Sequence, residues 1–336
     1  MDSLTQALLG ATTFGFVLDK EIGKKSLWIG AFAGTIPDLD VFLAPFFHKV
    51  AFLSIHRGFS HSMFLAVLLS VVLGSIFYRY YQKKQPPRKW MLAFFLALFT
   101  HSLLDVCTTF GTRLLSPFSN LLFSTNNIHV FEPIYTLILL GGIIYLGAKN
   151  HSKEKRQKIL FVTLFLSILY LSWTFVSKSI AQQHFETDLQ KQGIFYDRLM
   201  LSPTPLNSFL WHGIIKTEHG YYFGTYSLFD KRKWIHFYYE KSDNEIINMV
   251  NKNKLINTFL NYTQDFPLIR LDSMGNVNIF AVKYGPVNYL GKPEFIYPLS
   301  FYQNKLEDEF IKIDVPDKQI GPVKSFRELF KRMKGI

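Results

Sequence analysis

The chain has 336 residues, of which 49% are hydrophobic, 17% aromatic and 18% charged. This composition is too apolar and too aromatic for a disordered chain, and a single cysteine, Cys107, excludes a disulfide scaffold. The net charge of +12 would suggest a nucleic-acid-binding protein if it lay on a soluble fold. The positions of the basic residues therefore decide whether that interpretation holds.

The first 180 residues carry long apolar segments and only eight of the 25 acidic residues. Four segments approach the ~20 residues that a helix needs to cross a bilayer core. Two shorter ones are rich in Gly, Ala and Thr, small residues that let helices approach closely in a membrane. The long segments are 61–81, 90–107, 130–148 and 159–177, and the short ones are 4–18 and 26–36. We therefore predict a mainly α protein, with a polytopic membrane bundle of about six helices over residues 1–180.

The basic residues of this bundle gather on one side of it. Thirteen lysines and arginines lie in loops after the first, third and fifth predicted helices, whereas the opposite loops hold three, Lys49, Arg57 and Arg113. The positive-inside rule assigns the thirteen charges to the cytoplasm. The N-terminus and everything after the sixth helix then face outward from a bacterial-type inner membrane. Because short topology-setting loops explain the charge, we expect no nucleic-acid partner.

Residues 181–336 have a different pattern and predict a smaller, water-facing α+β domain on the extracytoplasmic side. Aromatic and β-branched residues around turn residues indicate strands, and apolar residues at helical spacing indicate helices. The predicted strands are 221–230, 233–240, 276–284 and 294–301, and the predicted helices are 243–262 and 325–333. This domain contains no motif with an evident chemistry.

Acidic residues and histidines of the bundle fall at its predicted outward ends. His101 and Asp105 are four residues apart and share one helix face. Asp38 follows Pro37, where a helix must break. The whole group comprises Asp38, Asp40, His56, His61, His101, Asp105 and Glu132. Four separate segments thus bring carboxylates and imidazoles to one membrane face.

This gathering favours a metal site. A charged side chain costs up to ~2.5–3.5 kcal/mol at mid-membrane, and clustered acids also repel one another; a divalent cation relieves both effects. Ligands of the His and Asp/Glu type, without cysteine, suit zinc or manganese. Each residue alone has an ordinary explanation as a turn, a helix start or a packed histidine. The metal interpretation depends on seven of them meeting at one face.

Two arginines and a hydroxyl-rich loop lie on the same predicted side. Arg57 and Arg113 are the only arginines there, and a guanidinium is a good bidentate partner for phosphate. Anchoring at the membrane interface is the alternative, and for Arg113 it is an equally good one. Thr108 and Thr109 follow Asp105, where they could contact substrate oxygens or cap the helix end.

Three motifs resemble the membrane-bound metal-dependent hydrolase family called YdjM-like, over about residues 1–135. They are Gly34-Thr-Ile-Pro-Asp-Leu-Asp40, His56-Arg-Gly-Phe-Ser-His-Ser62 and His101-Ser-Leu-Leu-Asp105. The resemblance implies that their acids and histidines fall on the family's motif positions. More distantly, that family is similar to zinc-dependent phospholipase C. Family members often have histidine at the position of Gln6, and many have aspartate at that of Glu132.

The first hypothesis is an integral-membrane metal-dependent hydrolase that acts on a phosphoester or lipid head group at the outer face. Bound zinc or manganese would lower the pKa of a water molecule to ~7. The expected metal ligands are Asp38, Asp40, His61, His101 and Asp105. The other candidates are Glu132 as a further ligand or, if it is not a ligand, as the base, and His56 as a further ligand or catalytic group. Arg57 is expected to stabilise charge, and Arg113, Thr108 and Thr109 to bind substrate.

Two other hypotheses come from different classes. The chain could be a non-catalytic membrane protein with a structural metal and a partner-binding outer domain. An open coordination position would separate the two, because a catalytic metal keeps one and a structural metal fills it. A transporter is the weaker third hypothesis, because the ionisable groups gather at one face, whereas transporter sites lie near the midplane.

Overall fold

A computed structural model describes residues 1–47, 52, 55–82, 85–148, 150–231, 234–243, 245–246, 254–271, 277–286, 295, 298–301 and 322–335. The chain is mainly helical and divides into two compact units. Unit 1 comprises Met1–Phe175 with Pro205–Asn207, and unit 2 comprises Val176–Thr204 with Ser208–Ile336. The predicted domain boundary, between residues 180 and 181, falls inside a continuous helix, α7 (Lys153–Lys191).

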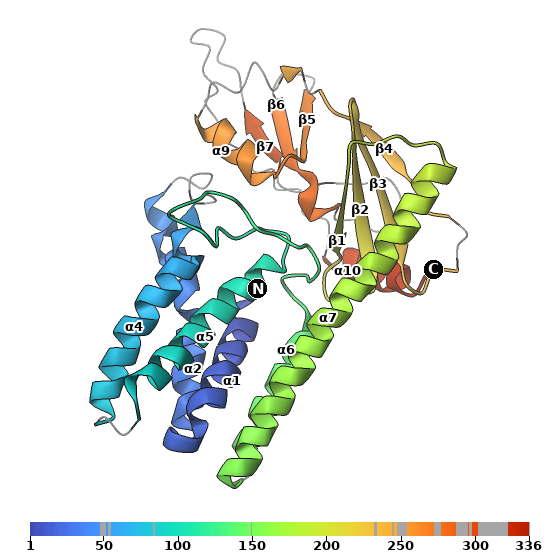
Figure 1. Cartoon of the computed structure of the whole chain (residues 1–336). Helices are drawn as coiled ribbons and strands as arrows, with labels where there is room; N and C mark the ends of the chain where they lie inside the picture. Colours follow the sequence, from blue (N-terminus) through green and yellow to red (C-terminus); the bar gives the residue numbers. More distant parts are fainter. Residues whose placement is uncertain are drawn as a thin grey trace. The chain divides into compact units, whose positions relative to one another are not determined.

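Unit 1 is built from helices (Figure 1). They are α1 (Ser3–Ile22), α2 (Lys25–Thr35), α4 (Met63–Tyr80), α5 (Pro87–Val106), α6 (Pro133–Ala148) and the first part of α7. Two 3-10 segments lie between α2 and α4: η1 (Ile36–Phe46) and η2 (Phe59–His61). Helices thus occupy all six ranges predicted from the apolar segments.

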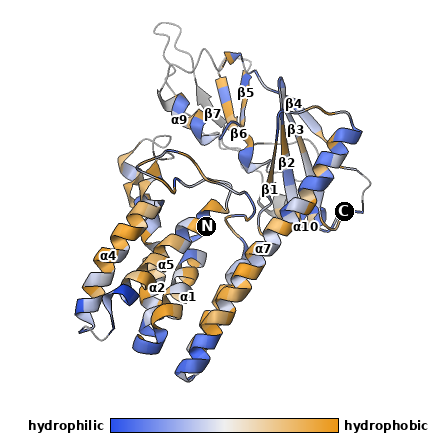
Figure 2. Ribbon diagram, in the orientation of Figure 1, coloured by the Kyte–Doolittle hydropathy of each residue, from blue (hydrophilic) through white to orange (hydrophobic). Residues whose placement is uncertain are grey.

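Within the described part of the chain, four segments are long and apolar enough to cross a membrane by length and composition. They are Lys25–Phe46, Met63–Tyr80, Pro87–Val106 and Lys153–Lys191. Figure 2 shows apolar residues along the outer faces of α4 and α7, and α4 exposes Leu68, Val72 and Ile76. Continuous exposed apolar faces are typical of helices in contact with lipid. The count of six crossings and the side that each loop faces stay predictions.

Helices α1 and α2 pack with their backbones in contact. A Cβ added at Gly10 would lie 2.4 Å from the Gly30 carbonyl oxygen, and one added at Gly34 would lie 2.6 Å from the Gln6 carbonyl oxygen. Only glycine permits such an approach, as in small-residue packing of membrane helices. The contact sets the end of α2, which leads into η1, beside Gln6 of α1.

At the other end of α1, a buried ion pair joins α1 to α7. The Arg156 Nε donates to Asp19 Oδ2 at 2.7 Å, and both residues are buried. Arg156 is one of the thirteen basic residues predicted to face the cytoplasm, and in the structure its guanidinium pairs with the Asp19 carboxylate. Breaking such a buried pair from one side typically costs about 3–5 kcal/mol.

The described residues of unit 2 form two small antiparallel sheets. The first has the order β1-β2-β3-β4 and the second the order β5-β6-β7. The strands are β1 (Arg198–Pro203), β2 (Leu210–Thr217), β3 (Gly220–Ser227), β4 (Tyr238–Lys241), β5 (Pro267–Leu271), β6 (Val277–Ala281) and β7 (Pro298–Phe301). In the parts of this region that the structure describes, the α-helices after the first sheet are α9 (Lys254–Tyr262) and α10 (Pro322–Met333).

The predicted elements of this region match the structure in part. Strands β3, β4, β6 and β7 lie within or overlap the four predicted ranges, and α10 covers the predicted helix at 325–333. Of the predicted helix at 243–262, the last part is α9, while residues 247–253 lie outside the described residues. Strands β1, β2 and β5 were not predicted. Six consecutive residues of β2 are buried, so this strand lacks the alternation that marks a half-buried strand.

The last turns of α7 form part of the core of unit 2. Phe185 and Leu189 pack with Trp211, Ile215 and Ile235 in one buried cluster. The α7 helix comes so close to β2 that a Cβ at Gly213 would lie 2.1 Å from the Phe185 ring. This part of α7 is therefore fixed against the first sheet.

Candidate metal centre

Four side chains of unit 1 converge on one point. Asp38, His61, His101 and Asp105 each offer one ligand atom, and the four atoms lie within 4.8 Å of one another. Asp38 comes from η1, His61 from η2, and the other two from adjacent turns of α5. His61, His101 and Asp105 are fully buried, and only Asp38 is partly exposed. We call these four residues the metal cluster.

The distances within the metal cluster are those of groups that face one small volume. His61 Nε2 lies 3.2 Å from Asp38 Oδ1, 3.3 Å from Asp105 Oδ2 and 3.1 Å from His101 Nε2. His101 Nε2 lies 3.5 Å from Asp38 Oδ1 and 3.8 Å from Asp105 Oδ2. Both imidazoles thus present the same ring atom to the same two carboxylates.

The opposite ring nitrogens fix how the imidazoles are protonated. His101 Nδ1 lies 2.6 Å from the Gly34 carbonyl oxygen, which can only accept, so Nδ1 donates and, in the neutral imidazole, Nε2 presents a lone pair. Ser60 Oγ donates to Asp40 Oδ2 at 2.5 Å and lies 2.9 Å from His61 Nδ1. The Ser60 hydroxyl therefore accepts from His61 Nδ1. Metal-binding histidines are held by outer partners of this kind.

A divalent cation fits the metal cluster. Two imidazole lone pairs 3.1 Å apart, with two carboxylate oxygens beside them, repel one another unless a positive charge lies among them. Asp105 Oδ2 is buried and accepts no hydrogen bond from the described residues. The ligand set contains two nitrogens, two oxygens and no sulfur, as zinc and manganese sites do. The residues present can hold such an ion.

The fifth predicted ligand, Asp40, does not reach the point of convergence. Its Oδ1 lies 2.8 Å from His56 Nδ1, and its Oδ2 accepts from Ser60 Oγ and from the Arg57 backbone N–H at 3.3 Å. It faces His61 only at Nδ1, 3.8 Å away. Asp40 therefore orients His56 directly and His61 through the Ser60 hydroxyl. Residues that hold metal ligands in this way lie outside the ligand set itself.

His56 lies at the edge of this arrangement. Its side chain is 32% exposed, and its ring packs edge-on against His61, with the ring centroids 5.8 Å apart. Because Asp40 faces His56 Nδ1, the other ring nitrogen is oriented away from that carboxylate. The Asp40 carboxylate thus fixes the orientation of this partly exposed imidazole.

Arg57 lies beside the metal cluster and is buried. Its Nε is 3.4 Å from Asp105 Oδ2, its Nη1 donates to Thr108 Oγ1 at 2.9 Å, and its guanidinium carbon lies 4.7 Å from the Phe110 ring centroid. Its backbone has a φ of +59°, a region that non-glycine residues seldom adopt. The Arg113 N–H holds this turn by donating to the Arg57 carbonyl at 3.1 Å.

The hydroxyl-rich loop supports Arg57. Thr108 Oγ1 donates to the Asp105 carbonyl at 2.8 Å while it accepts from Arg57, so it caps α5 and orients the guanidinium. Thr109 is buried in the same loop. Arg113 contacts this region through the backbone bond to Arg57. Of the three predicted substrate-binding residues, Thr108 is therefore the one whose side chain the structure brings to Arg57.

Glu132 forms a separate buried site. Its Oε1 accepts from the Tyr170 hydroxyl at 2.6 Å, and its Oε2 accepts no hydrogen bond from the described residues. Burial raises the pKa of Glu132 to about 7, and the bond from Tyr170 opposes this shift. Glu132 was predicted to belong to the metal site, but it is not one of the four groups that converge.

Gln6 reaches the metal cluster from α1. Its Nε2 lies 3.2 Å from Asp105 Oδ1 and 3.3 Å from the His101 carbonyl oxygen. The amino group of Met1 also pairs with Asp105 Oδ1. Gln6 thus orients the carboxylate whose other oxygen faces the two imidazoles.

Three contributors were missed from the sequence. Ser60 and the Gly34 carbonyl orient the two imidazoles, and Tyr170 is the partner of Glu132. Ser60 stands next to His61 inside a motif and could have been noticed there. A backbone carbonyl and a tyrosine 38 residues away from Glu132 leave no signal in the sequence.

Comparisons with known proteins agree with the membrane character of unit 1. The family model described as YdjM inner membrane protein matches residues 1–181. An uncharacterised protein, YfhP of Bacillus subtilis (strain 168), is 25% identical over 233 residues, which cover 67% of this chain and 68% of the relative. No solved structure matches the chain. Since the family model covers more than half of its residues, the chain belongs to the YdjM inner membrane protein family.

Proposed function

We propose that this protein is an integral-membrane metal-dependent hydrolase that cleaves a phosphoester or lipid head group. The observation that carries the proposal is the convergence of four ligand atoms, with both imidazoles oriented from behind so that each turns a lone pair inward. Such preorganised outer contacts are a feature of metal sites. The cluster also lies next to a buried guanidinium and a carboxylate-held histidine.

The residues divide the chemical work between them. Asp38, His61, His101 and Asp105 would hold zinc or manganese, and a bound ion of this kind supplies Lewis acidity and lowers the pKa of a water molecule to about 7. Arg57, beside Asp105, would bind the negatively charged oxygens of the scissile group. His56, oriented by Asp40 and partly exposed, would accept and return the proton.

Exposed aromatic residues support a lipid substrate. Phe42 and Phe46 lie on η1, the segment that carries Asp38, and both are exposed. Phe118 is 81% exposed and contacts Phe64 of the first turn of α4 edge-on, with the ring centroids 5.6 Å apart. Large exposed apolar side chains beside a polar site suit contact with acyl chains at the membrane interface.

We propose a multi-pass topology in which the metal cluster opens on the extracytoplasmic side. The support is the excess of lysine and arginine in the loops that would face the cytoplasm. Unit 2 would then also lie outside, because it follows the last apolar helix, α7. Cysteine labelling of single-cysteine variants in intact cells checks this arrangement.

The hydrolase proposal is tested with the purified chain in mixed micelles that contain a phospholipid, and separately with a chromogenic phosphodiester. We expect turnover with zinc or manganese and none after chelation. The variant His56→Gln keeps a donor for Asp40, so it should retain the metal but lose about 10²–10⁴-fold in kcat, the usual contribution of a positioned acid or base. Asp105→Ala should lose both the bound metal and the turnover.

Two results would count against the proposal. Stoichiometric metal without turnover of either substrate would make the metal structural, as in the second hypothesis. Equal kcat for wild type and His56→Gln, at equal metal content, would remove His56 from the reaction.

A further inference from the structure

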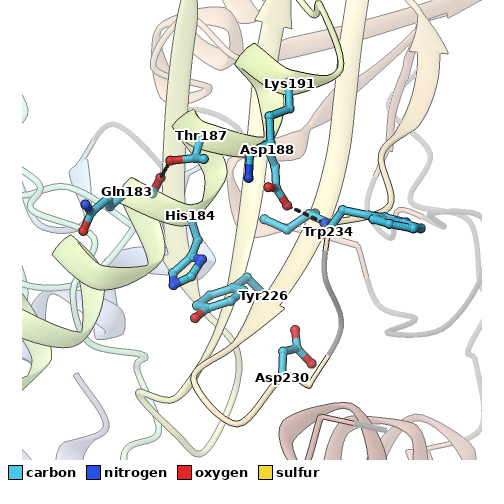
Figure 3. A pocket seen from close by; sticks show the side chains of 9 residues that line it. Gln183, His184, Thr187, Asp188, Lys191, Tyr226, Asp230 and Trp234 are labelled. Carbon is cyan, nitrogen blue, oxygen red and sulfur yellow. Dashed lines mark hydrogen bonds between the residues drawn. The ribbon is translucent and has the colours of Figure 1, made fainter.

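A cavity of about 350 Å³ lies within unit 2 (Figure 3). One wall is the C-terminal part of α7, with His184, Asp188 and Lys191, and the other is formed by Tyr226 of β3 and the segment after it, with Asp230 and Trp234. This volume is in the range of small-molecule sites, ~300–1,000 Å³. All the lining residues belong to the same compact unit, and the metal cluster belongs to the other.

The two walls are tied together by hydrogen bonds. Asp188 is buried, and its Oδ2 accepts from the Ile235 backbone N–H at 2.6 Å. Gln192, one turn further along the chain, donates from Nε2 to the Ile235 carbonyl at 3.0 Å. Both bonds fix the chain next to Trp234. The cavity is therefore held open by the fold, and a preformed site loses less entropy on binding.

Aromatic faces line or border this cavity. The His184 ring stacks on Tyr226, with centroids 4.4 Å apart and planes 22° apart, and Figure 3 shows the two rings one above the other. Trp234 is 67% exposed although it is the largest type of apolar side chain. Aromatic rings with polar tips are typical of sites where one side of a ligand is apolar and the other hydrogen-bonding.

The described residues that line or border the cavity carry acidic and basic groups that balance one another. Asp230 is paired with Arg332, whose Nη2 donates to Asp230 Oδ2 at 2.6 Å. Asp188 and Lys191 are three residues apart on one helix face and carry opposite charges. Among the described lining residues, neither an anion nor a cation would therefore meet a surplus of opposite charge. The carboxylate, ammonium, amide and hydroxyl groups instead offer both acceptors and donors.

We propose that this cavity binds a carbohydrate. A sugar ring has a face of C–H groups that packs on an aromatic ring, and hydroxyl groups on its edges that both donate and accept hydrogen bonds. Trp234 and the His184–Tyr226 stack supply the aromatic faces, and Asp188 and Lys191 supply an acceptor and donors. The proposal does not depend on the function of the metal cluster.

Saturation-transfer NMR on the purified full chain tests the proposal. The probes are glucose, N-acetylglucosamine and its disaccharide, with choline and inorganic phosphate as charged comparators. The detergent is a polyoxyethylene, which carries no sugar head group. We expect saturable binding of at least one sugar, and an affinity at least about tenfold lower in Trp234→Ala and in Asp188→Asn. The amide introduced by Asp188→Asn retains an oxygen that accepts from the Ile235 N–H, so this variant keeps the wall in place.

The matched control is Trp28→Ala, which removes an exposed tryptophan of unit 1 and should bind the sugar like wild type. Thermal unfolding of each variant checks that it is folded. Three results would overturn the proposal: no saturable binding of any of the sugars, sugar binding unchanged in both cavity variants, or saturable binding of choline or phosphate in place of a sugar.

Discussion

Two of the buried acidic side chains of unit 1, Asp105 and Glu132, have opposite surroundings. Asp105 is met by two imidazoles, the guanidinium of Arg57 and the amide of Gln6. Among the described residues, the Glu132 carboxylate has one hydrogen-bond partner, the hydroxyl of Tyr170. A buried carboxylate persists only where positive charge or several donors compensate it, and otherwise it takes up a proton. The difference shows that burial alone does not make a metal ligand, since a ligand needs organised neighbours.

The largest expected effect is the loss of metal from one site and not from the other. Asp105→Ala should reduce stoichiometric zinc or manganese to background, because it removes a ligand and leaves two imidazoles facing each other. Glu132→Ala, the matched control, should keep full occupancy. Elemental analysis of the detergent-purified variants measures both. If Asp105→Ala retained metal, or if Asp105→Ala and Glu132→Ala lost it equally, Asp105 would not differ from Glu132 as a metal ligand.

A pH dependence should come from Glu132. Its pKa in the folded protein is about 7, above the ordinary value of 4.5, so the folded state holds the proton more tightly than the unfolded state. The free energy of unfolding should therefore fall as the pH rises from about 4.5 to about 7, and stay level above that. The full effect is about 3 kcal/mol, at about 1.36 kcal/mol per pKa unit.

Glu132→Gln removes this dependence. The variant should have a higher thermal midpoint than wild type at pH 8, and nearly the same midpoint at pH 5. A difference that is larger at pH 5 would mean that the carboxylate is charged in the folded protein, which contradicts the proposed protonation of this site.

The backbone contact between α1 and α2 offers a third test. In Gly34→Ala the new Cβ would lie 2.6 Å from the Gln6 carbonyl oxygen, so overpacking should lower the free energy of unfolding by about 1–3 kcal/mol. It should also weaken metal binding, because the Gly34 carbonyl orients His101. A Cβ added at Gly141 of α6 would meet no neighbouring atom of the described residues within 4 Å, so Gly141→Ala should not lower the free energy of unfolding and should leave metal binding unchanged. Denaturation and metal titration of both variants compare them.

The smallest expected effect concerns the outer partners. Ser60→Ala breaks the link from His61 through Ser60 to Asp40 and should lower metal affinity about 10–100-fold, the usual effect of losing an outer hydrogen bond. Tyr170→Phe removes the equivalent hydroxyl from Glu132 and should leave metal affinity unchanged. Competition against a chelator measures both affinities. Equal affinities in wild type and Ser60→Ala would show that Ser60 has no part in the site.

Much of the metal cluster could be predicted because helical spacing and chain breaks are local. His101 and Asp105 lie four residues apart on α5, and Asp38 lies in the 3-10 segment after Pro37. Asp40 was predicted as a ligand because it lies two residues after Asp38, but within η1 its carboxylate faces Ser60 and His56 instead. Which of two neighbouring acids faces the metal depends on packing between segments, which a sequence does not record.

The remaining differences have the same origin. The ion pair of Arg156 with Asp19 was not predicted, because the two residues are 137 positions apart in the sequence. Strands β1 and β2 were missed because most of their residues are buried on both faces, so that no alternation marks them. The cavity between α7 and β3 arises where two elements meet, so no single segment could indicate it.

X-ray absorption spectroscopy at the zinc edge tests the central claim most directly. For the zinc-loaded protein we predict two imidazole nitrogens, carboxylate oxygens and no sulfur around the ion, and one imidazole after His101→Gln. A sulfur ligand, or an imidazole count that does not change in His101→Gln, would contradict the assignment of the ion to Asp38, His61, His101 and Asp105.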